Sequence, residues 1–507
     1  MKKIFFLAAM MLPMMSFAQK RVMVIADPHV VPQSIIDKEP DFDAKLQKQR
    51  KMLDLSEPIW HALLDTALKH KPDLVLIPGD LTRDGEAVSH DTVSAGIHRL
   101  EAAGIRTLVI PGNHDLPGEN WETLYSGTFD AAINSVKDAG SHSFVAEPFD
   151  GITVIGIDGS DGNASIGKLS AATQQWILDQ ADAAVAKGNL IIAMAHWQIL
   201  EHFDQVGTLE AASRFNNADA LRDKLMHHGV NLVLTGHFHV NGITIFRDTT
   251  GVTNDSLVEI TTGSPITFPC PYRWMTISED RKSIAITTDY IKSLGVHDDF
   301  TTYSRDWMHE HTANLIPGLA RKFWGKILDS WATEIVPELK KNPATAMFIP
   351  SIEKALPQDE ATQVAITQKH IGEPAINMYL FYSEASEARH PTEGEAVANA
   401  LYSGMIAMLT EIFDNNSWLG EFFFAIAKPY IQKPVESLVQ DETLHGTKHA
   451  DVTDDLDLIL GDKGSVLTGV ESVEGDALRA VKFIHNGQLY IRKGNQIYTP
   501  QGQRIMQ

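Results

Sequence analysis

The fold is decided by the stretch Val75–Asp115, in which two apolar runs each end in Pro-Gly and then in a polar side chain. The first run reads Leu76-Ile77-Pro78-Gly79-Asp80, and the second reads Val109-Ile110-Pro111-Gly112-Asn113-His114-Asp115. Short apolar runs bounded by Pro and Gly are typical of buried strands. The helical spacing of residues 88–103 predicts a helix between them. The stretch therefore predicts a β-α-β unit of a parallel sheet.

The two runs bring Asp80 and Asn113 to the same edge of that sheet. Ligands of open α/β sheets bind beyond the carboxyl ends of the strands, so these two side chains are expected side by side. Gly79 and Gly112 leave the backbone free to bend sharply beside them. Asp and Asn also occur at such positions for turn chemistry alone, and the rest of the chain decides between the two interpretations.

Three further predicted strands end in the same way. Residues 21–26 lead to Asp27-Pro28-His29, residues 190–195 lead to His196, and residues 230–235 lead to Gly236-His237-Phe238-His239. Side chains two residues apart on extended backbone point the same way, so Asp27 and His29 can hold one ion together. This regularity over five strands is hard to obtain by chance, and it favours a metal site over ordinary turns.

The types of side chain at these strand ends indicate which metals would bind. Asp, Asn and His without a thiolate suit Mn, Fe or Zn rather than a structural zinc site. Seven ligands exceed what one tetrahedral ion accepts, so two ions about 3.5–4 Å apart are expected, with a carboxylate between them. The candidate ligands are Asp27, His29, Asp80, Asn113, His196, His237 and His239.

These motifs resemble, in content and order, those of the calcineurin-like metallophosphoesterases, over roughly residues 20–295. The stretch from Asp80 to Glu86 is similar to the branch that contains cyclic-nucleotide and glycerophosphodiester phosphodiesterases. Arg83 stands where purple acid phosphatases have a tyrosine ligand, so the chain departs from that branch. The resemblance implies an α/β fold of two packed β-sheets flanked by helices.

The resemblance also implies a role for each residue of the site. The first metal would be held by Asp27, His29 and His239, the second by Asn113, His196 and His237, and both by the bridging Asp80. His114 would protonate the leaving oxygen, and Asp115 would orient His114. The implied reaction is hydrolysis of a phosphodiester by attack of a metal-bridging hydroxide. Two alternatives stay open: a phosphomonoesterase with the same site, and an enzyme tethered by a C-terminal interaction module.

Some side chains outside the motifs lie in segments that could reach the edge of the site and contact the organic part of an ester. Surface His, Arg and aromatic residues usually have no such role. These candidates are Trp121, Tyr125, His142, His202 and Arg214.

The length of 507 residues exceeds a single core, so two or three domains are expected. A phosphoesterase domain is predicted over residues 19–295 and a mostly helical accessory domain over residues 296–450. Residues 451–507 are predicted to form a small β-rich unit, because short β-type runs alternate there with turns such as Asn486-Gly487.

The first residues predict export of the protein. Lys2 and Lys3 precede an apolar run over residues 4–15, and Ser16-Phe17-Ala18 follows it, which is the pattern of a cleavable signal peptide over residues 1–18. The protein is therefore expected in the periplasm or outside the cell. No later run approaches the roughly 18 apolar residues of a transmembrane helix, so no membrane span is expected.

Charge and cysteine content limit the partners and crosslinks. The net charge of −22 repels polyanions, so a small phosphate ester is the expected substrate and extended nucleic acid is not. Cys270 is the only cysteine, so no internal disulfide can form, and its thiol is expected to pack as a small apolar group.

Overall fold

The computed structural model gives coordinates for the whole chain. The structure describes residues 19–413 apart from 117–124, 126–128, 130–134, 161–165, 203–212, 249–255, 296 and 386–389, then single helical positions between 418 and 435 and the strands between 449 and 505. The predicted signal peptide and Trp121 lie outside the described residues.

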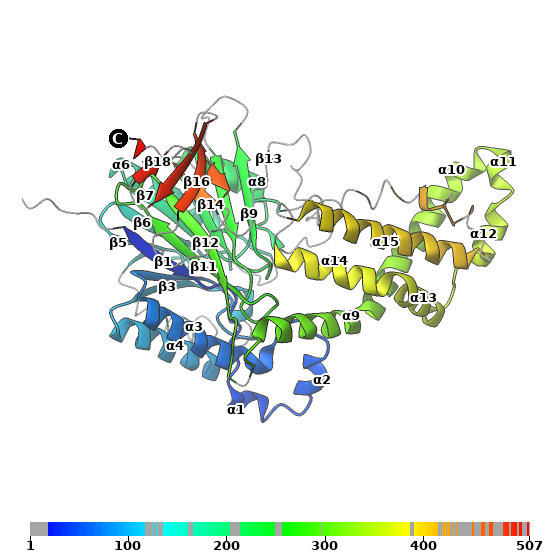
Figure 1. Ribbon diagram of the computed structural model, residues 1–507, viewed down its shortest axis with the longest axis horizontal. Helices are drawn as coiled ribbons and strands as arrows, with labels where there is room; N and C mark the ends of the chain where they lie inside the picture. Colours follow the sequence, from blue (N-terminus) through cyan, green and yellow to red (C-terminus); the bar gives the residue numbers. More distant parts are fainter. Residues whose placement is uncertain are drawn as a thin grey trace, which may run out of the picture.

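Strands of the first half of the chain, together with three C-terminal strands, form two β-sheets that pack against each other (Figure 1). The seven-stranded sheet contains, in spatial order, β15 (Val466–Gly469), β14 (Leu458–Leu460), β12 (Ile284–Tyr290), β11 (Pro271–Ile277), β1 (Lys20–Val24), β2 (Leu74–Pro78) and β3 (Arg106–Ile110). The eight-stranded sheet contains β13 (His449–Ala450), β9 (Gly242–Arg247), β10 (Ser256–Thr261), β8 (Leu232–Thr235), β7 (Leu190–Ala195), β6 (Ile152–Ile157), β5 (Phe144–Phe149) and β4 (Val136–Lys137).

The strands that carry the predicted ligands run parallel within each sheet. In the first sheet β2 pairs in parallel with β1 and β3, and in the second sheet β7 pairs in parallel with β6 and β8. Helix α4 (Ala87–Ala102) connects β2 to β3, which confirms the predicted β-α-β unit. The carboxyl ends of β1, β2 and β3 therefore lie at one edge, and those of β7 and β8 lie beside them across the sandwich.

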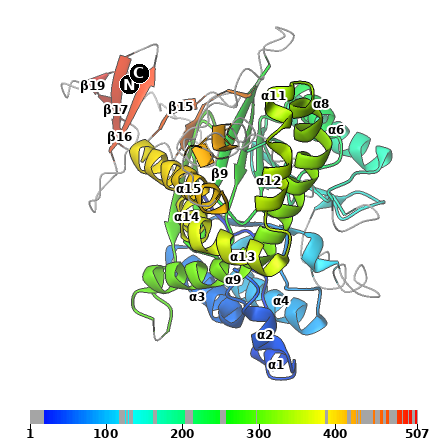
Figure 2. The ribbon, with the colours of Figure 1, turned by 90° about the vertical axis from the view of Figure 1, so that its right-hand side faces the viewer.

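Apolar side chains fill the space between the sheets and the space under the flanking helices. One core cluster contains residues of both sheets, such as Val75 and Leu234, together with residues of α3 (Ser56–His70) and α4. A second cluster lies between the eight-stranded sheet and helices α6 (Ala171–Ala186) and α8 (Ala218–His227). Figures 1 and 2 show α3 and α4 on one side of the sandwich and α6 and α8 on the other. The expected fold of two packed sheets flanked by helices is confirmed.

Residues 300–412 are mostly helical, and these helices project away from the sheets (Figure 1). They are α9 (Phe300–Ser330), α10 (Val336–Lys340), α11 (Pro343–Ala346), α12 (Ile349–Ala355), α13 (Glu360–Thr367), α14 (Glu373–Glu384) and α15 (Pro391–Ile412), with π-helical turns at Trp331–Ile335 and Gln368–Gly372. We call this part the helical region. It has an apolar core of its own, and a smaller cluster joins α9 and α14 to Phe268 of the first half. None of the helices in the described part of the chain has the length and apolar character that crossing a bilayer requires.

The C-terminal strands belong to more than one sheet. β13 pairs with β9, and β14 pairs with β12, so both extend the two sheets of the first half. A separate four-stranded sheet contains β16 (Ala480–His485), β17 (Gln488–Lys493), β18 (Gln496–Tyr498) and β19 (Arg504–Ile505). The division into domains at residues 295 and 450 stays a prediction.

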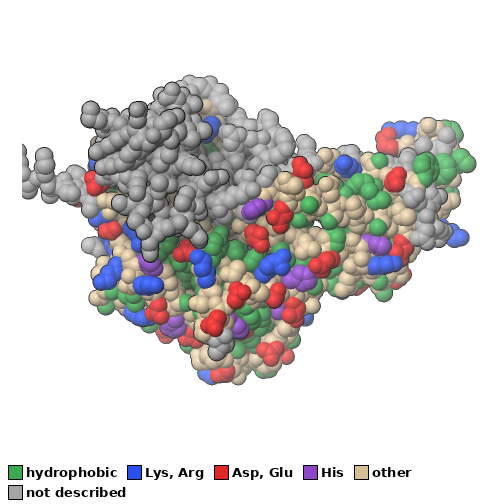
Figure 3. Space-filling model, viewed as in Figure 1, with side chains coloured by type: hydrophobic (Ala, Val, Ile, Leu, Met, Phe, Trp, Pro, Cys, Tyr) green, Lys and Arg blue, Asp and Glu red, His purple; other side chains and the backbone are tan. Residues whose placement is uncertain are grey.

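The charges of the described surface are mixed. Figure 3 shows Asp and Glu side chains spread over one face with Lys and Arg among them, rather than gathered into one patch. The acidic side chains on the described part of this face therefore form no single negative patch.

Candidate metal centre

The backbone at the strand ends turns through the left-handed region at the predicted ligands. The φ angles are 51° at Asp27, 42° at His29, 50° at Asp80, 68° at His237 and 62° at His239. Asp and His reach this region more readily than most residues, but each such residue still costs on the order of 1 kcal/mol. Backbone strain of this kind collects at functional sites. Five strained residues at one edge therefore mark this edge as a site.

Four of the predicted ligands form a first cluster. Asp27, His29, Asp80 and His239 each offer a ligand atom, and these atoms all lie within 4.8 Å of one another. The Nε2 atoms of His29 and His239 are 2.9 Å apart. His29 Nε2 lies 3.5 Å from Asp80 Oδ2, and His239 Nε2 lies 3.5 Å from Asp27 Oδ1.

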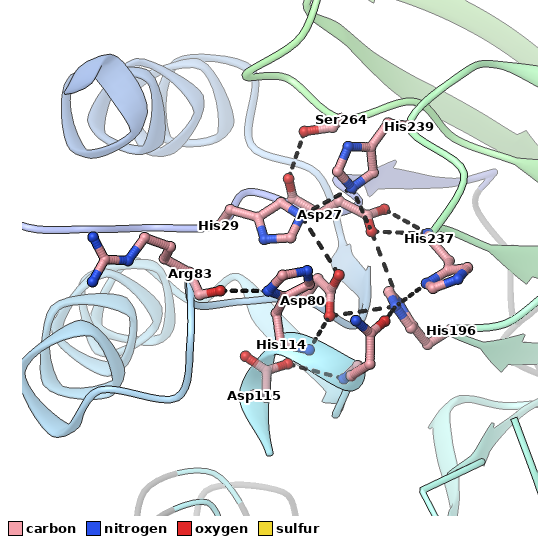
Figure 4. A network of polar contacts seen from close by, with 12 residues as sticks. Asp27, His29, Asp80, Arg83, His114, Asp115, His196, His237, His239 and Ser264 are labelled. Carbon is pink, nitrogen blue, oxygen red and sulfur yellow. Dashed lines mark hydrogen bonds and ion pairs between the residues drawn. The ribbon is translucent and has the colours of Figure 1, made fainter. Parts of the chain in front are cut away.

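The remaining ligands form a second cluster that shares Asp80 with the first (Figure 4). Asp80, His196 and His237 also offer ligand atoms within 4.8 Å of one another. His196 Nε2 lies 3.0 Å from Asn113 Oδ1, 3.0 Å from His237 Nδ1 and 3.3 Å from Asp80 Oδ1. One oxygen of Asp80 thus faces the first cluster and the other faces the second. All seven predicted ligands are brought together in the grouping that the resemblance implied.

Burial keeps most of these imidazoles neutral. It lowers the pKa values of His29 and His239, and it lowers the pKa of His237 to about 3. At His196 burial acts in the same direction, but the charge and hydrogen bond of Asp80 prevail and raise the pKa to about 9. Neutral imidazoles offer lone pairs to a cation, and a metal at the second cluster would displace the His196 proton.

The donor set fits a pair of metal ions. Two pairs of ring nitrogens face each other, His29 with His239 at 2.9 Å and His196 with His237 at 3.0 Å, so nitrogen ligands gather at two points beside Asp80. His196 donates its Nδ1 proton to the Pro78 carbonyl at 2.9 Å, which directs Nε2 into the cluster. Asp27 is fixed by the His237 N–H at 2.8 Å. Nitrogen and oxygen lone pairs that converge on two points are the arrangement that two cations would satisfy.

His114 lies at the edge of the centre. Its backbone N–H donates to Asp80 Oδ1 at 2.8 Å, while its ring Nδ1 donates to the Arg83 carbonyl at 2.6 Å and lies 3.2 Å from Asp84 Oδ1. Burial works to lower the pKa of His114, but the Asp84 hydrogen bond and the Asp80 charge raise it. The protonated form is therefore favoured. The His114 side chain is 30% exposed at this edge.

Asp115 has a different contact from the one that the resemblance implied. Its carboxylate accepts from the backbone N–H groups of Leu81, Thr82 and Gly112 at 3.1, 2.9 and 2.9 Å, and from the Thr82 hydroxyl at 2.8 Å. These bonds tie the turn after β2 to the turn after β3. The carboxylate that orients the His114 ring in this structure is that of Asp84.

Glu259 is a buried residue of the site that the sequence analysis missed. It is fully buried on β10 and accepts from the Ile199 and Leu200 N–H groups at 2.8 and 2.7 Å. It also lies 3.0 Å from His202 Nε2 and accepts from the Thr235 hydroxyl at 3.0 Å. It therefore braces the segments that carry His196 and His237. The signal in the sequence was a single carboxylate within the apolar run Ser-Leu-Val-Glu-Ile-Thr.

The described candidates for contact with the ester's organic part make their contacts elsewhere. His202 is engaged with Glu259, Thr244 and Thr261, and Tyr125 is buried against Phe129 and His142. Arg214 donates to the Ile199 carbonyl at 2.7 Å and to Asp219 at 3.0 Å.

Comparison with known proteins gives, for the first half of the chain, the same family as the sequence motifs. Residues 20–241 match the sequence pattern of the family described as calcineurin-like phosphoesterase. A probable cyclic nucleotide phosphodiesterase of Synechococcus is 26% identical over 188 residues, which cover 36% of this chain and 65% of that protein. A probable glycerophosphodiester phosphodiesterase of Arcobacter nitrofigilis is 28% identical over 156 residues, which cover 30% of this chain and 53% of that protein. The matches thus span from about half to about two thirds of the length of these curated relatives.

Among solved structures, a dimetal phosphatase from Danio rerio is similar with a TM-score of 0.42 and 13% identity, over 53% of this chain and 95% of that one. PhoD is similar with a TM-score of 0.33 and 10% identity, over 53% of this chain and 65% of that one. In its strand-end motifs and in this sequence match, the region of residues 20–241 is similar to the calcineurin-like phosphoesterase family.

Proposed function

We propose that the protein is a metal-dependent phosphoesterase that hydrolyses a small phosphodiester. The observation that carries this proposal is Asp80, whose two oxygens face two separate clusters of ligands. A shared carboxylate at that position is what two ions need in order to be held close together. The names of the two curated relatives support a diester as the substrate.

Two bound divalent ions would supply positive charge to the ester oxygens and lower the pKa of a water, the chemistry that attack by a bridging hydroxide requires. The side chains of the chain do the rest. Asn113 is a neutral ligand, so it reduces the negative charge of the pocket and favours entry of an anionic ester. His114, held by Arg83 and Asp84, donates a proton to the departing oxygen.

A phosphomonoesterase with the same site is the second candidate reaction. The ligand geometry serves both ester classes, because both place a phosphoryl group between the ions. A C-terminal module that tethers the enzyme would need exposed aromatic side chains to contact its partner. Trp418 is 63% exposed, whereas Phe424 is buried in the core of the helical region, which favours a packing role for Phe424.

Export belongs to the same proposal. The pattern of residues 1–18 supports a cleaved signal peptide and a periplasmic or secreted enzyme. The N-terminal sequence of the mature protein from exporting cells tests this, because cleavage after Ala18 would leave Gln19 as the first residue.

The function is tested by metal analysis of the purified protein followed by assays with a panel of phosphate mono- and diesters. We expect two metal ions per chain, drawn from Mn, Fe and Zn, and faster hydrolysis of diesters than of monoesters. Faster hydrolysis of monoesters would favour the second candidate. A metal-loaded protein that hydrolyses neither class would contradict the proposal.

A further inference from the structure

The segment of residues 47–52 lies against the loop that supports the metal centre. The Met52 N–H donates to the Ile266 carbonyl at 2.8 Å. Two residues earlier in that loop, the Ser264 hydroxyl donates to the backbone carbonyl of the ligand Asp27 at 2.7 Å. Met52, the neighbour of Lys51, is therefore connected to the ligand Asp27 through a single loop.

The ammonium of Lys51 lies close enough to the metal centre to interact with the charged groups there. Its side chain is partly buried, which lowers its pKa, and the carboxylates that act on its ammonium are Asp80, Asp84 and Asp27. The same ammonium acts on the imidazoles of His29, His114 and His239. Among the described residues, none forms a hydrogen bond or an ion pair with it. A partly buried ammonium that has no fixed partner is costly, and an anion that binds beside it removes that cost.

The helical region contacts this segment at Arg50 and Gln47. The Arg50 guanidinium lies over the ring of Tyr379 on α14, 4.3 Å from its centroid. Asn314 on α9 donates to the Gln47 carbonyl at 3.1 Å. A third contact places α14 at the site itself, since the ring of Tyr382 lies 6.2 Å from that of Phe238, the residue between two ligands. Figure 1 shows the near ends of α9 and α14 against the sheets.

We propose that Lys51 binds a non-bridging oxygen of the phosphoryl group at the metal centre, and that the helical region positions Lys51 through Arg50 and Gln47. The lysine side chain carries a compact positive charge on a flexible chain, and lysine commonly binds phosphate oxygens in proteins. The ammonium would face the anionic ester from the side of the helical region. This inference rests on the proposed function, and it assigns to the helical region a part in forming the substrate site.

The test measures binding of inorganic phosphate to the metal-loaded full-length protein by titration calorimetry. Lys51→Met should keep both metals and bind phosphate about 10–100-fold more weakly, the loss expected for one hydrogen bond to a charged group. In ester assays the same variant should raise KM. Lys51→Arg should recover part of the affinity. The matched control is Lys48→Met, which removes the same charge from an exposed side chain of the same segment and should stay within about twofold of the parent protein.

A second variant tests the support from the helices. Tyr379→Leu leaves Lys51 in the chain but removes the ring under Arg50, and it should weaken phosphate binding by a smaller factor. Equal phosphate affinities for Lys51→Met and Lys48→Met would overturn the proposal. Loss of metal from Lys51→Met would also overturn it, because Lys51 would then be needed to form the metal centre. If phosphate binding depends on Lys51 but no ester is hydrolysed, the proposed function fails and the assignment of Lys51 stands.

Discussion

At the scale of single residues, His114 belongs to neither ligand cluster, although its ring lies 4.7 Å from that of His29, and its pKa is raised. If it protonates the leaving oxygen, His114→Ala should keep both metals and lower turnover of an alkyl ester by about 10²–10⁴. A nitrophenyl ester should lose much less, because nitrophenolate departs without a proton. The measurement compares the two rates with metal content checked.

The matched variant for this prediction is Asp84→Asn, which removes the carboxylate next to the ring but keeps the imidazole. It should show a smaller loss with the same preference for aryl esters. Equal losses for alkyl and aryl esters in His114→Ala would contradict the role of His114 as an acid.

Cys270 gives a prediction for stability at high pH. Burial raises the pKa of its thiol from 9.0 to about 12. Between these values the unfolded chain releases the thiol proton while the folded chain keeps it, so rising pH favours unfolding. The fall in Tm between pH 7.5 and pH 10.5 should therefore be smaller in Cys270→Ala than in the parent protein. Parallel falls in thermal denaturation curves would show that the thiol does not contribute.

At the scale of elements, β10 acts on the site through Glu259 although none of its residues is a predicted ligand. Replacing Glu259 by Gln should weaken the bonds to the Ile199 and Leu200 N–H groups and loosen the segment after His196. A buried N–H without a partner costs about 1–3 kcal/mol. We expect loss of affinity for the metal of the second cluster, while the first metal stays.

Metal titrations followed by elemental analysis measure this difference. Thr153→Val is the control, because Thr153 is also buried in the eight-stranded sheet and accepts one hydrogen bond from Asn189, but on another strand. Equal weakening of both metals, or the same effect from Thr153→Val, would show that Glu259 contributes only general stability.

The elements around the site were predictable because their signals are local. The apolar runs before Asp80 and Asn113 correspond to β2 and β3, and the helical spacing between them corresponds to α4. The partners of side chains were not predictable. That Asp115 would bond three backbone N–H groups, or that Glu259 would reach two separate segments, depends on how distant parts of the chain meet. The left-handed backbone at Asp27 and His237 was not predictable either, because Asp and His adopt this conformation at only a minority of their positions.

The pairing of the C-terminal strands was also not predictable, because their partners lie far away in the sequence. The run around residues 457–460 indicated a strand, and β14 is found there at Leu458–Leu460. Its pairing with β12, about 170 residues earlier, could not be read from the local pattern. Nor does helical periodicity show that α14 would lie against Phe238.

At the scale of the whole molecule, the helical region and the C-terminal strands complete surfaces of the first half. Deleting residues 296–507 would remove β13 and β14 from the sheet edges and uncover the apolar contact between Phe268 and α9. Exposed strand edges and apolar patches promote association. We expect this truncated protein to aggregate in size-exclusion chromatography.

A shorter deletion is the control for this prediction. Removing residues 471–507 takes away the separate sheet of β16 to β19 and leaves β13, β14 and β15 in the chain, so it should remain monodisperse. If the chain that ends at residue 295 is monodisperse and fully active, the helical region has no part in completing the first half.

The central claim is that Asp80 joins two metal sites, and anomalous diffraction from crystals grown with Mn²⁺ tests it most directly. The account predicts two anomalous peaks about 3.5–4 Å apart on either side of the Asp80 carboxylate. One peak should lie among Asp27, His29 and His239, and the other among Asn113, His196 and His237. At least one peak should disappear in Asp80→Asn, since a neutral amide cannot neutralise and space two cations. A single peak in the parent protein, or two peaks that persist in Asp80→Asn, would contradict the account.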